Sequence, residues 1–82
     1  MKDNLQYEFE FHASADRHGV DHNDIAHAFR NAILLWELDD ALQMCVGSGW
    51  SGELLEVGFF RRAELVVVIH AMPARAKFLR RT

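Results

Sequence analysis

The run of five aliphatic residues at Leu65–Ile69 is the feature that most constrains how this chain can fold. An apolar run of this length is typical of a buried strand. His70 follows the run, and Pro73 then opens a basic segment. Because proline is favoured in the first turn of a helix, the pattern predicts a central strand over 64–71 and a helix over 73–81.

The N-terminal part of the chain predicts a strand followed by two helices. Residues 5–11 alternate strictly between apolar and polar side chains, which is the period of a strand with one wet face. Ser14 can cap a short helix over 14–18. Asp21 is a good N-cap for a second helix over 22–32, with Asp24 as a weak capping box.

The middle of the chain predicts more strands, joined by short connections. A turn at Asp39–Ala41 and a glycine-rich loop at 47–52 separate apolar runs, from which we predict strands over 33–38, 42–46 and 53–60. Short connections favour antiparallel neighbours. The expected fold is therefore α+β, an antiparallel sheet of four to five strands with the helices packed on one face.

Length and composition favour one globular domain over residues 1–82. Half of the 82 residues are hydrophobic, which argues against disorder. No apolar stretch reaches the ~18 residues of a membrane span, and the N-terminus carries acids where a signal peptide would be apolar. The single cysteine, Cys45, cannot form an internal disulfide and lies in an apolar run, so we expect a buried, inert thiol and a cytoplasmic protein.

The charge of the chain is unevenly distributed. The net charge is −3, but residues 61–82 carry six of the nine basic residues and a single acid, Glu64. A basic C-terminal segment on an acidic chain can contact phosphates, although a solvated helix face would give the same pattern.

Several short motifs occur in an order that resembles the BrnT-type toxins of bacterial toxin–antitoxin pairs, or a compact relative of them. The motifs are RHGV at 17–20, Val46-Gly47, SGELLEV at 51–57 and VVIHAM at 67–72, followed by the basic segment. The family strand ends in Ser-Ala-Arg, whereas this chain has His70-Ala71-Met72.

The resemblance implies a small ribonuclease of the RelE-like fold that needs no cofactor, binds RNA and is neutralised by a protein antitoxin. Cleavage of RNA without a metal needs an acid, a base and a cation for the phosphate, and His70, Arg75 and Lys77 supply these types. The basic or histidine side chains expected to bind RNA are Arg17, His18, Arg80 and Arg81. His70 could instead be a structural residue at the strand end, and Arg17 and His18 could simply compensate a helix dipole.

The other conspicuous residues are four histidines and a tryptophan. His12, His18, His22 and His27 do not form a helical zinc pair: His18 and His22 are four residues apart, but Gly19 breaks the helix between them, and His22 and His27 are five residues apart. We therefore expect no metal site. Trp50, in the glycine-rich loop, is expected either to contact a partner or to fold back over the core.

Two other classes of function compete with the ribonuclease. The first is a non-enzymatic interaction domain, such as a homodimer that pairs through an edge strand. The second is a DNA-binding module, because residues 14–32 imitate a helix-turn-helix. The second helix of that segment carries only Arg30 as a basic residue, against Asp21 and Asp24, which disfavours binding to DNA.

Overall fold

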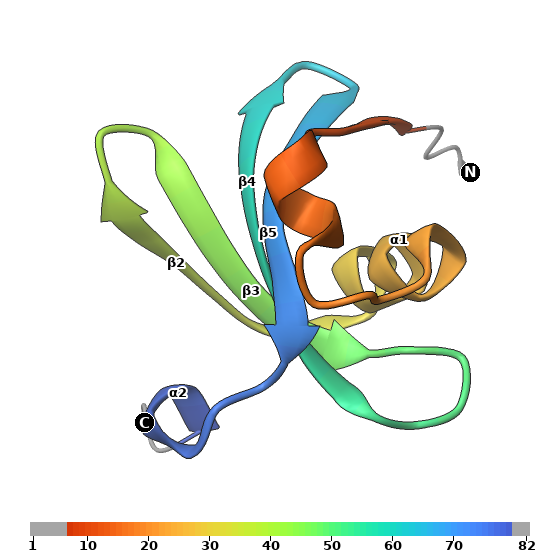
Figure 1. The fold of residues 1–82 in the computed structure, drawn as a ribbon. Helices are drawn as coiled ribbons and strands as arrows, with labels where there is room; N and C mark the ends of the chain where they lie inside the picture. The colour runs from red at the N-terminus through yellow and green to blue at the C-terminus, as the bar shows by residue number, and fades with distance from the viewer. Residues whose placement is uncertain (1–6, 80–82) are drawn as a thin grey trace, which may run out of the picture.

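A computed structural model describes residues 7–79 and contains one sheet with helices on both of its faces (Figure 1). The elements in chain order are β1 (Glu8–Phe11), the 3₁₀ helix η1 (Ala13–Asp16), α1 (His22–Arg30), β2 (Ala32–Asp39), β3 (Leu42–Ser48), β4 (Leu54–Arg62), β5 (Leu65–Pro73) and α2 (Ala76–Leu79). All the predicted strands are present, with most ends shifted by one or two residues. The part of the first predicted strand before Tyr7 lies outside the described residues.

The sheet has the strand order β1-β5-β4-β3-β2. The strand built on the aliphatic run, β5, lies between β1 and β4, so it is an interior strand, although β4 and not β5 is the central strand of the five. The strands from β2 to β5 form an antiparallel meander, as their short connections predicted.

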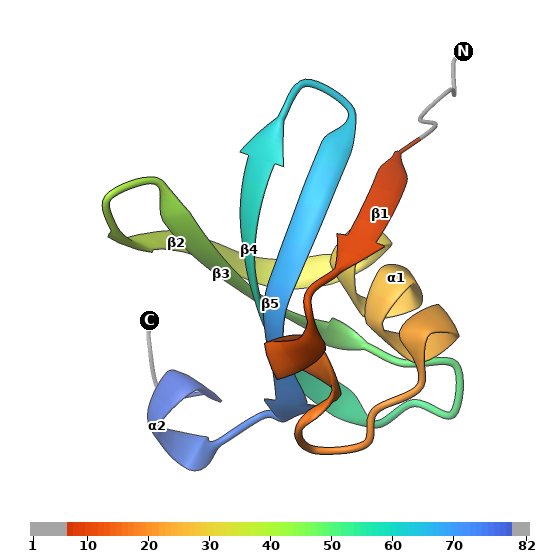
Figure 2. The ribbon, with the colours of Figure 1, turned by 45° about the horizontal axis from the view of Figure 1, so that its top comes forward.

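The first strand corrects the prediction of an antiparallel sheet. β1 pairs with β5 in parallel, so the five-stranded sheet is mixed. Figure 2 shows β1 beside β5, with η1 and α1 forming the connection that carries the chain to β2 at the other edge. The alternation of residues 5–11 identified a strand, but a side-chain period contains no information about which strand becomes its neighbour.

The N-terminal helices also differ from their predicted form. The segment expected as a helix over 14–18 is a single 3₁₀ turn that begins at Ala13, with His12 rather than Ser14 at its N-cap. A helix-turn-helix therefore lacks its first α-helix within the described part of this segment. None of the helices within residues 7–79 is long and apolar enough to cross a membrane.

The second helix, α1, begins where it was predicted to begin and ends two residues early, at Arg30. Asp21 is its N-cap, and the Asp21 side chain accepts a hydrogen bond from the Asn23 backbone N–H. Asp24 does not complete a capping box, because its Oδ1 accepts the backbone N–H of Trp50 at 2.9 Å. Asp24 thus ties the helix to the glycine-rich loop.

The C-terminal helix begins three residues later than predicted and lies on the other face of the sheet, not on the face that α1 covers. Pro73 is the last residue of β5, and within the described residues the helix spans only Ala76–Leu79. Proline has no N–H to continue a strand ladder, so here it ends the strand rather than opening the helix.

The core lies between α1 and the face of the sheet that we call the α1 face. Phe29 of α1 packs edge-on against Phe59 of β4, with ring centroids 4.9 Å apart. A Cβ on Gly47 would lie 1.9 Å from the backbone oxygen of Ala28, so only glycine lets α1 approach β3 this closely. The buried apolar residues include Ile25, Cys45, Val57, Val66 and Val68.

Candidate functional site

The face of the sheet opposite α1 contains a buried carboxylate, Glu56. This residue pairs in register with Val46 of β3 and with Met72 of β5, and its side chain is 0% exposed. Buried carboxylates are rare unless they are paired with donors or cations. The partners of Glu56 therefore define the candidate site.

Two residues from the C-terminal part of the chain satisfy Glu56. Nε2 of His70 lies 2.9 Å from its Oε2. The guanidinium of Arg75 donates through Nη2 to Oε2 at 2.7 Å and through Nε to both carboxylate oxygens at 3.1 Å. The backbone N–H of Arg75 donates to Oε1 at 2.9 Å. We call these three residues the Glu56 cluster.

The connection after β5 brings Arg75 over Glu56. The backbone N–H of Ala74 donates to the Leu54 carbonyl at 2.9 Å, which turns the chain across the end of β4. His70 reaches Glu56 from β5, because it pairs with Gly58, two residues along the same face of β4. The structure thus brings Arg75 and His70 together on one carboxylate that both contact.

The cluster keeps Glu56 ionised. Burial by itself raises the pKa of Glu56, but the hydrogen bonds from Arg75 and His70 and the charge of Arg75 outweigh it and hold the pKa below its ordinary value. The hydrogen bond to Glu56 raises the pKa of Arg75. At neutral pH the site therefore contains a fixed carboxylate and a fixed guanidinium.

The cluster is open to solvent on one side. The side chain of His70 is 30% exposed and that of Arg75 is 44% exposed, although Glu56 beneath them is fully covered. A buried anion thus orients two side chains that can still touch a solute.

The position of His70 depends on an irregularity in the sheet. Gly58 pairs with His70 and Phe59 pairs with Val68, so Ile69 is the extra residue at this step. The sheet is therefore irregular beside Gly58, with the additional residue on β5. The Ser14 hydroxyl donates to the Ile69 carbonyl at 2.5 Å, which anchors η1 at the same place.

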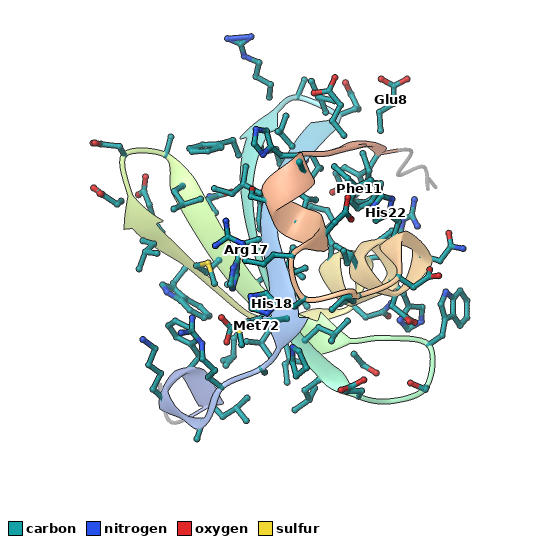
Figure 3. The ribbon with its side chains drawn as sticks, in the orientation of Figure 1. Glu8, Phe11, Arg17, His18, His22 and Met72 are labelled. Atoms are coloured by element: carbon teal, nitrogen blue, oxygen red, sulfur yellow. The ribbon has the colours of Figure 1, made fainter. Side chains whose placement is uncertain are left out.

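The segment after η1 places the second predicted histidine beside the first. The rings of His18 and His70 lie edge-to-face with centroids 6.1 Å apart. Arg17, the C-cap of η1, is exposed, and Figure 3 shows it in the same region of the view as His18 and Met72.

The other predicted basic residues are more peripheral. Nζ of Lys77 lies 5.0 Å from the centre of the Phe78 ring, and the Arg75 guanidinium carbon also lies 5.0 Å from it. Phe78 in turn contacts the Trp36 ring at 5.3 Å, which fixes α2 on this face. The predicted RNA-binding residues Arg80 and Arg81 lie outside the described residues.

Trp50 is not part of the cluster. It is exposed at the tip of the loop between β3 and β4 and packs against His27 of α1, with ring centroids 4.2 Å apart. It does not fold over the core, so of its two expected roles only the contact with a partner remains a prediction.

The histidines and the cysteine have structural contacts. His22 stacks on Phe11 at 3.8 Å and bonds Asp16 at 2.6 Å. No group of three or more His, Cys, Asp or Glu residues within residues 7–79 could hold a metal ion. Cys45 is buried as predicted, and burial raises its pKa to about 12.

Sequence reasoning identified His70 and Arg75 but missed Glu56. The one feature of the sequence that could have indicated Glu56 is its position between Leu55 and Val57 in an apolar strand. An isolated acid in such a strand is normally interpreted as a solvent-facing residue. In the folded protein the segment at Ala74 and Arg75 crosses this face of the sheet and covers Glu56.

The fold and the site define a small α+β protein with a mixed five-stranded sheet and a histidine–carboxylate–guanidinium cluster on the sheet face opposite its main helix. Comparisons with protein-family models, with curated proteins and with solved structures find no match. The similarity to BrnT-type toxins therefore stays a prediction.

Proposed function

We propose that the Glu56 cluster is the active site of a metal-independent ribonuclease of the toxin type. The observation that carries the proposal is the pair of partly exposed side chains, His70 and Arg75, held by one buried carboxylate. A base fixed beside a cation is the arrangement that attack on a phosphodiester needs.

The residues divide the reaction between them. His70 contacts Glu56 through Nε2, which leaves Nδ1 for the substrate. Arg75 uses Nε and Nη2 on Glu56, which leaves Nη1 for a phosphate oxygen. His18, edge-on to His70, is the second titratable group within reach of the same phosphate.

The step is a transesterification that needs no co-reactant. One histidine removes the proton of the ribose 2′-hydroxyl, and the 2′-oxygen attacks the phosphorus. The bond from phosphorus to the 5′-oxygen breaks, and the leaving oxygen takes a proton from the other histidine. The products are a 2′,3′-cyclic phosphate and a 5′-hydroxyl end. Arg75 stabilises the charge on the phosphoryl oxygens.

Other residues extend the site along the RNA. Arg17 and Lys77 contribute exposed positive charge, and Arg80 and Arg81 continue the basic segment in the sequence. A cytoplasmic location and a protein antitoxin belong to the same proposal, and an antitoxin that covered this face would block access to His70.

The test is cleavage of single-stranded RNA by the purified protein in the presence of EDTA. We expect fragments with 2′,3′-cyclic phosphate ends, and we expect His70→Gln and Arg75→Gln each to lower the rate about 10²-fold or more. His22→Ala is the matched control, since this exposed histidine lies outside the cluster. Intact RNA with the wild type, or equal rates for wild type and His70→Gln, would contradict the proposal.

A non-enzymatic interaction domain is the second candidate, and Trp50 is the observation in its favour. An exposed tryptophan on a loop that Asp24 holds in place suits a contact with another protein. An unchanged RNA, together with a partner that Trp50→Ala releases, would favour this function over the ribonuclease.

A further inference from the structure

A small hollow lies directly beside the Glu56 cluster. It has a volume of about 170 Å³, and both His70 and Arg75 line it. Its apolar lining comes from three strands and from α2, through Leu38, Leu42, Met44, Ile69 and Phe78. A substrate whose phosphate contacts Arg75 would therefore place a neighbouring group against an apolar surface.

Two irregularities of the sheet meet at this hollow. Leu38 is the extra residue at the register shift between Glu37 and Asp39 in β2. Ile69 is the extra residue in β5, and both extra residues line the hollow. Bulges are frequent next to active sites, where they redirect a side chain. Two strands that are not neighbours are thus irregular at the one place where the apolar lining reaches the proposed catalytic residues.

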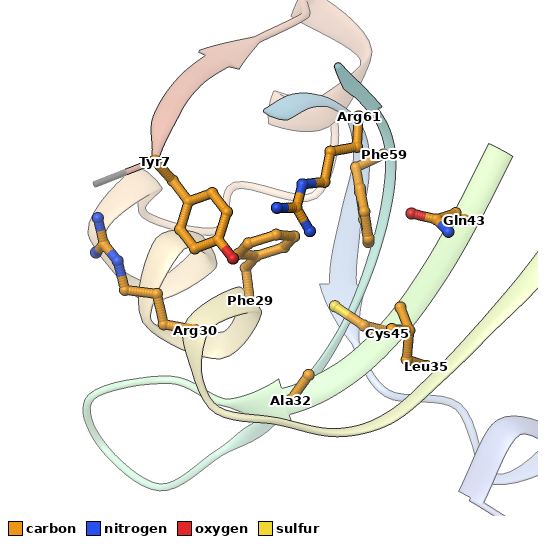
Figure 4. Close-up of a pocket in the computed structure, with 9 residues that line it drawn as sticks. All are labelled: Tyr7, Phe29, Arg30, Ala32, Leu35, Gln43, Cys45, Phe59 and Arg61. Carbon is orange, nitrogen blue, oxygen red and sulfur yellow. The ribbon is translucent and has the colours of Figure 1, made fainter. Parts of the chain in front are cut away.

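A larger hollow on the α1 face does not compete for the same substrate. It has a volume of about 250 Å³, and its lining includes Phe29 of α1 and Leu35 of β2 (Figure 4). Neither His70 nor Arg75 is among the described residues that line it. Because the sheet separates it from the Glu56 cluster, a substrate held at the cluster reaches only the smaller hollow.

We propose that the smaller hollow binds one nucleobase of the RNA strand, next to the phosphate that Arg75 contacts. This inference rests on the proposed ribonuclease function, since RNA is the substrate that brings a base to this place. Pockets for drug-sized ligands have volumes of about 300–1,000 Å³. A hollow of about 170 Å³ suits a single base rather than a whole nucleotide. Unpaired RNA bases are commonly bound against aromatic side chains and arginine guanidinium groups.

The chemistry of the lining also predicts which bases the hollow accepts. His70 and Arg75 are the only polar side chains among the described residues that line it, and both are bonded to Glu56. To distinguish one base from another, a site needs donors and acceptors placed along the edge of the base. The hollow therefore accepts any of the four bases, and their cleavage rates should agree within about ten-fold. A base paired in a duplex is excluded, because it would first have to leave its stack.

The experiment uses deoxyribonucleotide strands that contain a single ribonucleotide, so that only one bond can be cleaved. A nucleotide without a base, placed on one side of that bond or on the other, removes one base and keeps the backbone. We expect one of these two abasic strands to have a kcat/KM lower by about ten-fold or more. An abasic nucleotide at a distant position is the control and should have no effect. Equal kcat/KM for all of these strands would overturn the inference.

Leu38→Ser tests the lining from the side of the protein. Leu38 is 51% exposed, so the change should leave the fold intact, which circular dichroism and urea unfolding check. We expect kcat/KM to fall about five-fold or more on the strand with all its bases and to stay unchanged on the sensitive abasic strand, where the contact is already missing. Leu35→Ser is the matched control, because Leu35 is a 63% exposed leucine of the same strand that lines the other hollow. Equal losses on both strands, or an effect no larger than that of Leu35→Ser, would overturn the inference.

A binding measurement separates this inference from the ribonuclease itself. All-deoxy strands have no 2′-hydroxyl to attack, so fluorescence anisotropy measures their Kd without cleavage. A strand with bases should bind about ten-fold more tightly than a strand of the same length without any, and Leu38→Ser should reduce this difference. Base-dependent binding without cleavage of RNA would support the base site and refute the ribonuclease. Cleavage that ignores every abasic position would do the reverse, and a protein that neither binds nor cleaves would refute both.

Discussion

Replacing Glu56 by glutamine should destabilise the protein strongly at neutral pH. Oε1 accepts from the backbone N–H and Nε of Arg75, and Oε2 accepts from His70 and from Nε and Nη2 of Arg75. In either orientation, the amide NH₂ of glutamine would face at least two of these donors. The change therefore removes the negative charge and places an amide donor opposite other hydrogen-bond donors, without changing the volume of the side chain.

The magnitude follows from the burial of Glu56. Breaking a buried ion pair costs about 3–5 kcal/mol, and the lower value applies here because His70 and Arg75 are partly exposed and can turn to water. We expect Glu56→Gln to lower the free energy of unfolding by about 3 kcal/mol at pH 7. For a chain of this size that lowers Tm by about 12–24 °C.

The effect should depend on pH in a defined direction. The pKa of Glu56 is lowered in the folded protein, so its contribution to stability is present above the unfolded value of about 4.3 and is lost as the pH falls through the folded pKa. The difference between wild type and Glu56→Gln should therefore be largest near pH 7 and should shrink below pH ~4.

Urea unfolding of both proteins between pH 3 and pH 8 measures this difference. Glu53→Gln is the matched control, because Glu53 is exposed just before β4 and should change stability by less than about 0.5 kcal/mol. If Glu56→Gln matched the wild type at pH 7, or if the difference stayed constant down to pH 3, the argument from a buried, ionised carboxylate would be refuted.

Three further predictions concern the fold. Gly47→Ala should cost about 3 kcal/mol or more in urea unfolding, because its Cβ meets the Ala28 carbonyl at 1.9 Å, whereas Gly49→Ala, which meets only side-chain atoms at 3.2 Å or more, should cost clearly less. Asp21→Ala should cost about 1 kcal/mol through loss of the α1 N-cap, and an unchanged stability would show that the cap contributes nothing. Cys45 should resist iodoacetamide in the native protein and react in urea, since burial raises its pKa to about 12; rapid native alkylation would contradict its burial.

The sequence predicted those parts of the fold that depend on local chemistry. The aliphatic run at Leu65–Ile69 became β5, and Asp21 became the cap of α1. Both signals are local, because side-chain period and capping depend on residues within one or two turns. Several of the errors involve a distant neighbour.

Three such errors have the same origin. β1 is parallel to β5, and the alternation of apolar and polar residues in β1 does not encode the identity or direction of the neighbouring strand. Asp24 binds the Trp50 backbone instead of its own helix end. Pro73 belongs to β5 and not to the helix, because it pairs with Leu55 across the sheet. In each case a contact of long sequence separation replaced the local one that the pattern favoured.

The candidate site shows the same division between local and distant information. His70 and Arg75 were identifiable by residue type, but their relation depends on Glu56, which no local pattern distinguishes from a solvated acid. Met72 pairs with Glu56 across the sheet, and Arg75 reaches the same carboxylate from the turn that follows β5. Glu56→Gln and Arg75→Gln should impair RNA cleavage by different routes: the first releases both His70 and Arg75 from the carboxylate that positions them, whereas the second removes the phosphate contact and leaves His70 bound to Glu56.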